Sequence, residues 1–149
     1  MKRLLILAGL GMALTVSPAA ALTEPECVAA WSTADANKDG YIAESEAPRY
    51  FAALRIATKP VADGRMSQAN FLEHCKAGLF TTAKLDAGAP LNGANSFTET
   101  QAKDRIVAAG YITVSGLAKD ANGIWRGTAM DGAKPVKVAV DYKGNVVAN

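Results

Sequence analysis

The chain has 149 residues, which suits one or two small domains, and half of it is hydrophobic. It carries 16 basic and 14 acidic residues, and two of the basic ones, Lys2 and Arg3, lie at the extreme N-terminus. Without those two, the charge is balanced at 14 residues of each sign. This balance argues against a surface for nucleic acid or for anionic lipid.

Residues 1–21 have the pattern of a secretory signal peptide. Lys2 and Arg3 precede an apolar run from Leu4 to Val16, and residues 19–21 are alanines. Small residues of this kind precede cleavage sites, so we predict cleavage before Leu22. The run is shorter than the ~20 apolar residues that span a membrane, which leaves a retained N-terminal anchor as the weaker alternative. We therefore expect a periplasmic or secreted protein with no stable membrane span.

Three short helices are predicted between residues 22 and 80. The first covers 23–34, where Thr23 is a capping residue and Pro25 falls in the first turn, which tolerates proline. The second covers Ser45 to Ala57, and the third begins after Ser67, which is also a capping residue. Apolar residues recur at helical spacing in each, so the three helices are expected to share one core.

Residues 35–46 alternate oxygen-bearing side chains before a glycine, and they fit the pattern D-x-[DN]-x-[DN]-G-x5-E at every specified position. Such a loop turns its side-chain oxygens toward one centre, and calcium prefers oxygen ligands. The predicted calcium ligands are the carboxylates of Asp35, Asp39 and Glu46. The side-chain amide oxygen of Asn37 and the backbone carbonyl of Tyr41 complete the predicted set.

The alternative for this loop is a polar turn before a helix, but that does not account for Gly40 and Glu46 together. Ala43, at the ninth position, has no side-chain oxygen, so a water is expected to complete the shell. The twelve residues resemble an EF-hand, which implies a helix on each side of the loop and a glutamate at the start of the second helix.

A second loop, residues 59–70, has the same register but not the same ligands. Gly64 follows Gly40 by 24 residues, and Met66 follows Ile42 by 24 residues. Lysine and asparagine occupy the first and last ligand positions of this loop, so we expect no calcium there. The spacing leaves room for a single helix between the loops, and it predicts that Met66 pairs with Ile42 in a two-stranded bridge.

The two cysteines, Cys27 and Cys75, lie on the first and third predicted helices. An even number of cysteines in an exported chain indicates a disulfide, so we predict that these two are joined. His74, the only histidine, precedes Cys75, and a catalytic Cys–His pair is the less favoured alternative.

Residues 81–96 are rich in Ala, Gly, Asn and Thr and are predicted to be a linker. After them, the capping box from Thr98 to Gln101 starts a helix that ends at Gly110. Three antiparallel strands are predicted to follow, at 111–118, 124–130 and 136–140, with a last turn at 141–145. The fold class is therefore α+β: an N-terminal all-α pair of hands, residues 22–80, and a small C-terminal α-β-β-β domain, residues 97–149. We expect the two parts to fold separately.

The C-terminal part resembles a PepSY-type domain. The resemblance lies in the helix 101–109, in Trp-Arg-Gly-Thr-Ala at 125–129, and in the closing stretch 138–147, Val-Ala-Val-Asp-Tyr-Lys-Gly-Asn-Val-Val. That family is associated with exported or membrane-attached proteins, some of them proposed to restrain peptidases. The resemblance implies a binding or regulatory module.

These patterns predict an exported calcium-binding protein with a C-terminal interaction module. The alternative is a regulator or inhibitor of an envelope peptidase, for which calcium is only structural. Its contact residues would be of types favoured at interfaces, namely Trp125, Arg126 and Tyr142, although Trp125 also suits the core of the small domain. No nucleophile has a plausible histidine partner, so we do not expect an enzyme.

Overall fold

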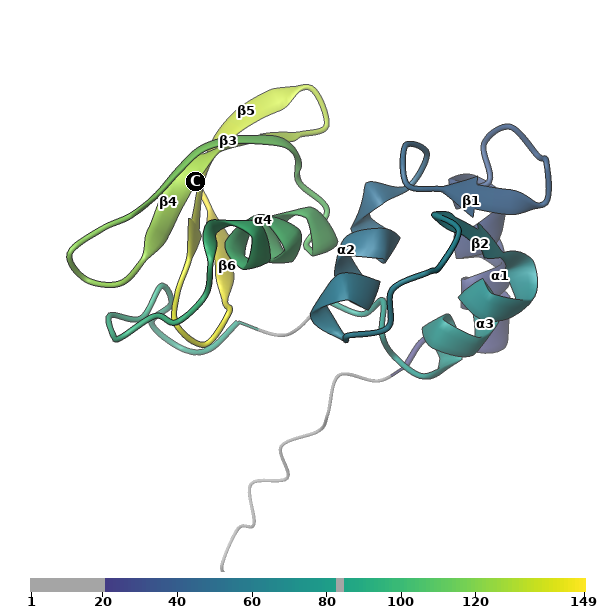
Figure 1. The fold of residues 1–149 in the computed structure, drawn as a ribbon, viewed down its shortest axis with the longest axis horizontal. Helices are drawn as coiled ribbons and strands as arrows, with labels where there is room; N and C mark the ends of the chain where they lie inside the picture. The colour runs from purple at the N-terminus through teal and green to yellow at the C-terminus, as the bar shows by residue number, and fades with distance from the viewer. Residues whose placement is uncertain (1–20, 83–84) are drawn as a thin grey trace, which may run out of the picture.

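The computed structural model describes residues 21–82 and 85–149, and the predicted signal peptide lies outside this part of the chain except for Ala21. The described residues form an α+β protein in two halves (Figure 1). Helices and a small sheet make up the N-terminal half, and a helix followed by a four-stranded antiparallel sheet makes up the C-terminal half. The helices of the described residues are all too short or too polar to cross a membrane.

The N-terminal half contains three helices and two strands. Its elements are α1 (Glu24–Ala34), β1 (Tyr41–Ala43), α2 (Pro48–Ile56), β2 (Arg65–Ser67) and α3 (Gln68–Lys76). Strands β1 and β2 pair antiparallel, with Ile42 opposite Met66, which confirms the predicted pairing. A single helix, α2, joins the two loops, as the spacing predicts. The half is thus not all-α in the strict sense, because the two loops form a small sheet.

The helix starts follow from local chemistry. At α1, the Glu26 carboxylate accepts hydrogen bonds from the N–H and the hydroxyl of Thr23, both at 2.7 Å, and these bonds lower the pKa of Glu26. At α3, the Ser67 hydroxyl accepts from the N–H of Asn70. Helix α2 begins at Pro48, later than the predicted Ser45, because the residue before a proline disfavours helical geometry. Glu46 therefore precedes the helix instead of lying in its first turn.

Aromatic rings and one disulfide form the centre of the N-terminal core. The Phe71 ring lies 5.6 Å from the Trp31 ring and 4.8 Å from the Tyr50 ring, measured between centroids. The predicted disulfide joins Cys27 to Cys75, and both cysteines are buried. It ties α1 directly to α3.

The C-terminal half consists of α4 (Glu99–Ala108), β3 (Ile112–Lys119), β4 (Trp125–Asp131), β5 (Lys134–Val140) and β6 (Val146–Ala148), with the strands in that spatial order. The capping box between Thr98 and Gln101 is present. The buried Ile106 of α4 packs against the sheet in a core that includes Val138 and Val140. The sheet has one strand more than predicted, because β6 is only three residues long and too short to give an alternating pattern.

The described part of the predicted linker packs against the C-terminal half. The Leu91 N–H donates to Asp141 Oδ2 at 2.9 Å, and the Gly93 N–H donates to the Asn122 carbonyl at 3.0 Å. Asp141 is fully buried, and its other carboxylate oxygen accepts from the N–H groups of Lys143 and Asn145. Leu91 and Gly93 are thus held against the turns of the C-terminal sheet, so this part of the predicted linker belongs to the C-terminal half.

The two halves also contact each other. Helix α2 packs on α4, and the Arg55 guanidinium donates to both carboxylate oxygens of Asp104, with a shortest distance of 2.7 Å. The same guanidinium lies 2.7 Å from a carboxylate oxygen of Glu44. Arg55 therefore links the loop that precedes α2 to the helix of the other half.

Candidate calcium site

The loop of residues 35–46 leaves the end of α1 and reaches α2 through β1. Asp35 caps α1, with its N–H donating to the Trp31 carbonyl at 2.9 Å, and it is only 7% exposed. Asp35 directly follows the last residue of α1 and is buried there, so its position is set by the end of the helix. The first predicted calcium ligand is therefore fixed in position by the fold.

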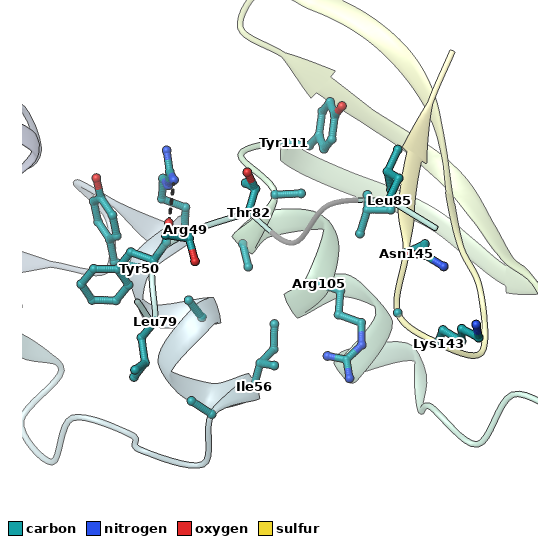
Figure 2. A pocket seen from close by; sticks show the side chains of 18 residues that line it. Arg49, Tyr50, Ile56, Leu79, Thr82, Leu85, Arg105, Tyr111, Lys143 and Asn145 are labelled. Atoms are coloured by element: carbon teal, nitrogen blue, oxygen red, sulfur yellow. Dashed lines mark hydrogen bonds between the residues drawn. The ribbon is translucent and has the colours of Figure 1, made fainter. Parts of the chain in front are cut away.

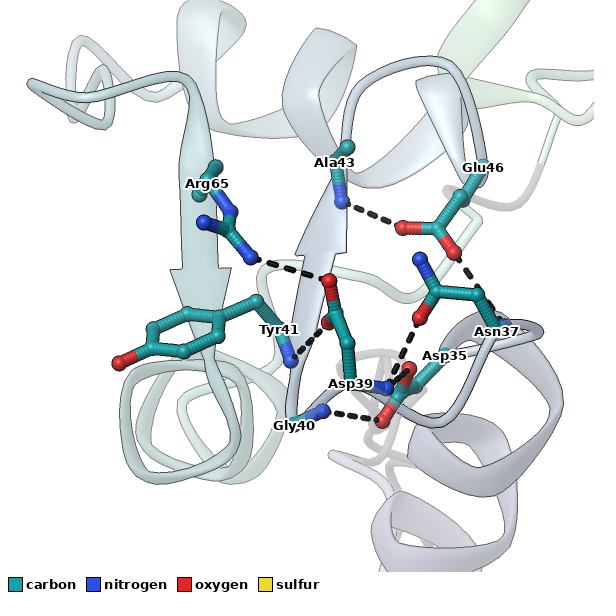
Figure 3. Close-up of polar contacts among 8 residues, drawn as sticks. All are labelled: Asp35, Asn37, Asp39, Gly40, Tyr41, Ala43, Glu46 and Arg65. Carbon is teal, nitrogen blue, oxygen red and sulfur yellow. Dashed lines mark hydrogen bonds and ion pairs between the residues drawn. The ribbon is translucent and has the colours of Figure 1, made fainter.

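The first half of the loop turns on its own side chains (Figure 3). The Asp39 N–H donates to Asp35 Oδ1 at 3.1 Å and to Asn37 Oδ1 at 2.9 Å, and the Gly40 N–H donates to Asp35 Oδ2 at 3.2 Å. Gly40 has a φ of 82°, a conformation that favours glycine. The bend brings side-chain oxygens of Asp35 and Asn37 onto the same backbone amide.

Glu46 reaches back across the loop. Its Oε2 accepts from the Ala43 N–H at 2.9 Å, and its Oε1 accepts from the Asn37 N–H at 3.4 Å. The carboxylate of Glu46, the last predicted ligand, therefore lies beside the backbone of Asn37, the second predicted ligand. Glu46 lies in a turn and not in the helix, because α2 begins only at Pro48.

Asp39 and Tyr41 lie where the loop enters β1. The Tyr41 N–H donates to Asp39 Oδ1 at 2.9 Å, while Asp39 Oδ2 lies 3.0 Å from Arg65 Nη2. The Arg65 guanidinium also stacks over the Tyr41 ring, 4.5 Å from its centroid. Sequence reasoning missed this arginine, although the pairing of the two loops already puts Arg65 opposite Ala43.

The donor set suits calcium, but its oxygens are engaged with other groups. Among the residues that the structure describes, no three acidic, histidine or cysteine side chains lie close enough together to hold a metal. The carboxylates instead accept from backbone N–H groups, and Asp39 pairs with Arg65. Three carboxylates and an amide oxygen within one short loop are hard ligands of the kind that calcium prefers. A carboxylate offers about four lone-pair sites, so it can accept these N–H bonds and still coordinate an ion, and the competitor for calcium is the arginine.

The three predicted partner contacts lie apart from the loop. The Trp125 Nε1–H donates to the Phe97 carbonyl at 3.0 Å, and the ring packs against the C-terminal core. Arg126 Nε donates to Asp120 Oδ2 at 2.8 Å, a bond that lowers the pKa of Asp120. Tyr142 is 38% exposed, with its ring against Gly93. Neighbouring strand residues point to opposite faces, so Trp125 and Arg126 do not share one surface.

Comparison of this chain with protein families, with curated proteins and with solved structures found no match.

Proposed function

We propose that this protein is an exported calcium-binding protein, in which the loop 35–46 holds one ion and the C-terminal half serves as an interaction module. The observation that carries the proposal is the return of the Glu46 carboxylate to the Asn37 N–H, at 3.4 Å. This contact brings the last ligand position to the beginning of a loop whose side chains supply the oxygen set of a calcium site.

The proposed role of the ion is structural. Calcium hands of extracytoplasmic proteins commonly have dissociation constants of roughly 10⁻⁴ to 10⁻³ M, so such a site is filled where calcium is abundant. Sensor proteins respond to calcium by opening a pair of helices. Here the disulfide between Cys27 and Cys75 ties α1 to α3, which opposes such an opening.

Calorimetric titration with calcium tests the site. The expected stoichiometry is one ion per chain, and Glu46→Gln or Asp35→Ala should weaken binding at least tenfold because each removes a charged ligand. Asp63→Ala is the matched control: it removes a carboxylate from the second loop and should leave the affinity unchanged. Two ions per chain, or equal effects of Asp35→Ala and Asp63→Ala, would contradict the proposal.

The interaction role rests on the uncovered face of the C-terminal sheet. Arg126 and Thr128 of β4 are exposed on the face opposite Ala129, which is buried toward α4. Retention of an envelope protein by the wild type, in a pull-down with and without calcium, tests this role. Retention that survives chelation and is lost in Arg126→Glu would favour the alternative of a peptidase regulator, provided that the retained protein is a peptidase.

A further inference from the structure

A cavity of about 520 Å³ lies between the two halves, away from the calcium loop (Figure 2). Its walls come from α2, from residues 79–82 and 85, from α4 and from the turn before β6. This volume lies within the range of small-molecule sites, which occur preferentially at domain interfaces. The residues of the loop 35–46 do not line it.

Much of the wall is apolar and accessible. Ile56 is 38% exposed and Leu85 is 49% exposed, and both line the cavity together with Leu79. Large apolar side chains that remain exposed in a concave surface indicate a binding site for an apolar group. The wall therefore suits a hydrocarbon chain.

The charged residues of the wall are all cations. Arg49, Arg105 and Lys143 line the cavity, and no aspartate or glutamate does so among the residues described. Figure 2 shows Arg105 and Lys143 on one side and Arg49 on the other. Two of the three already have partners: Lys143 Nζ lies 3.1 Å from Asp86 Oδ2, and Arg49 Nη2 donates to the Phe80 carbonyl at 3.4 Å.

Arg105 differs from the other two because it has no anionic partner in the described chain. It forms no ion pair there, and its buried Nε has no hydrogen-bond acceptor. The guanidinium is held in place by packing, with Cζ 3.9 Å from the centroid of the Phe97 ring and Nε close to the backbone of Gly144. The buried Nε is closed off by this packing, so the two Nη groups, which form no hydrogen bond within the described chain either, are the donors that remain for a carboxylate, and they can bind it through two hydrogen bonds.

We propose that this cavity binds a medium-chain carboxylate, with the carboxylate at Arg105 and the hydrocarbon chain along Ile56 and Leu79. A neutral amphiphile such as an alcohol offers one uncharged acceptor in place of the two charge-assisted hydrogen bonds of a carboxylate, and a cationic one would be repelled by Arg105, which is unpaired among the residues described. The site shares no lining residue with the calcium loop, so its test is independent of calcium binding.

Titration of the protein with octanoate, followed by NMR chemical shifts, tests the proposal. The expected result is saturable binding of octanoate with shifts at the cavity, at least tenfold tighter than binding of 1-octanol, and no binding of acetate at the same concentration. Arg105→Gln should weaken octanoate at least tenfold. Lys103→Gln, which removes an equal charge from an exposed position of α4 outside the cavity, should leave the affinity unchanged.

A second variant tests the cavity independently, so that the proposal can still be decided if Arg105→Gln does not fold. Ile56→Glu puts an anion into the apolar wall at an exposed position and should also weaken octanoate at least tenfold. The proposal is overturned if octanoate does not bind, if octanoate and 1-octanol bind equally well, or if folded Ile56→Glu binds octanoate as the wild type does.

Discussion

Arg65 Nη2 lies 3.0 Å from Asp39 Oδ2, so the strand of the second loop presents a cation to a predicted calcium ligand of the first. About half of each side chain is exposed, at 52% for Arg65 and 43% for Asp39. The guanidinium also stacks over the Tyr41 ring. The arginine therefore places a positive charge beside a carboxylate that calcium would need.

Removal of this cation should raise calcium affinity. An exposed ion pair contributes about 0.2–1 kcal/mol, so Arg65→Gln should tighten calcium binding by up to about fivefold in calorimetric titration. Lys76→Gln, which removes a charge from the exposed end of α3, is the control and should change the affinity little. Weaker binding in Arg65→Gln would mean that the arginine orients Asp39 for the ion instead of competing with it.

Asp141 should be a main contributor to the stability of the C-terminal half. Both carboxylate oxygens of Asp141 accept hydrogen bonds from backbone N–H groups, at Leu91 and at Lys143. An asparagine has only one acceptor oxygen, so Asp141→Asn would turn its amide N–H₂ toward one of these N–H groups and leave that group without an acceptor. We expect a loss of about 1–3 kcal/mol in the free energy of unfolding, measured by thermal or urea denaturation. Asp131→Asn, at the exposed end of β4, should cost far less.

The contribution of Asp141 should depend on pH in a definite direction. Burial acts to raise the pKa of its carboxyl, but the hydrogen bonds from Asn145, Leu91 and Lys143 outweigh it and the pKa is lowered. A lowered pKa in the folded state gives a stabilisation that is present above the unfolded value of about 3.9 and is lost as the pH falls toward the folded value. The difference in melting temperature between wild type and Asp141→Asn should be constant from pH 7 to pH 5 and shrink below about pH 4. An undiminished difference at pH 3 would contradict this assignment.

Arg55 should couple the unfolding of the two halves. Its side chain is 36% exposed and that of Asp104 only 13%, so this pair is better shielded than the others on the surface. Arg55→Gln should lower the free energy of unfolding by about 1 kcal/mol and separate the calorimetric transitions of the two halves. Arg126→Gln breaks a pair within the C-terminal half and should leave the separation unchanged. A single calorimetric transition in both variants would contradict this role of Arg55 and would show that the packing of α2 on α4 alone couples the unfolding of the two halves.

The disulfide should stabilise the N-terminal half strongly. Its cysteines are 48 residues apart, and by chain entropy closure of such a loop is worth about 4 kcal/mol. The double substitution of Cys27 and Cys75 by alanine should lower the melting temperature of the oxidised protein, and a reducing agent should have no further effect on that variant. Two reactive thiols in denatured, unreduced wild type would contradict the pairing.

Features with a local signature were predictable from the sequence. The caps at Ser67 and Thr98 follow from side chains within a few residues, and the 24-residue register alone predicted the pairing of Ile42 with Met66. The disulfide followed from the count of cysteines and from their helices. The caps and the strand pairing follow from spacing along the chain, whereas the disulfide follows from the presence of only two cysteines.

Contacts between distant segments were not predictable in this way. The ion pair of Arg55 with Asp104 joins residues 49 apart, and the bond from Leu91 to Asp141 joins residues 50 apart. No periodicity specifies such partners, because they depend on how α2 packs on α4 and how the chain crosses the sheet. The cavity that contains Arg105 is a consequence of the same packing, and so it was missed.

The position of the disulfide also determines what a protease could release. Lys38 is exposed within the proposed calcium loop, and the disulfide joins the chain before it, at Cys27, to the chain after it, at Cys75. A cut after Lys38 would interrupt the ligand loop, yet the two pieces would stay covalently attached. Such a nicked molecule would have lost the proposed calcium site while still migrating as one band on a non-reducing gel, and only reduction would reveal two fragments.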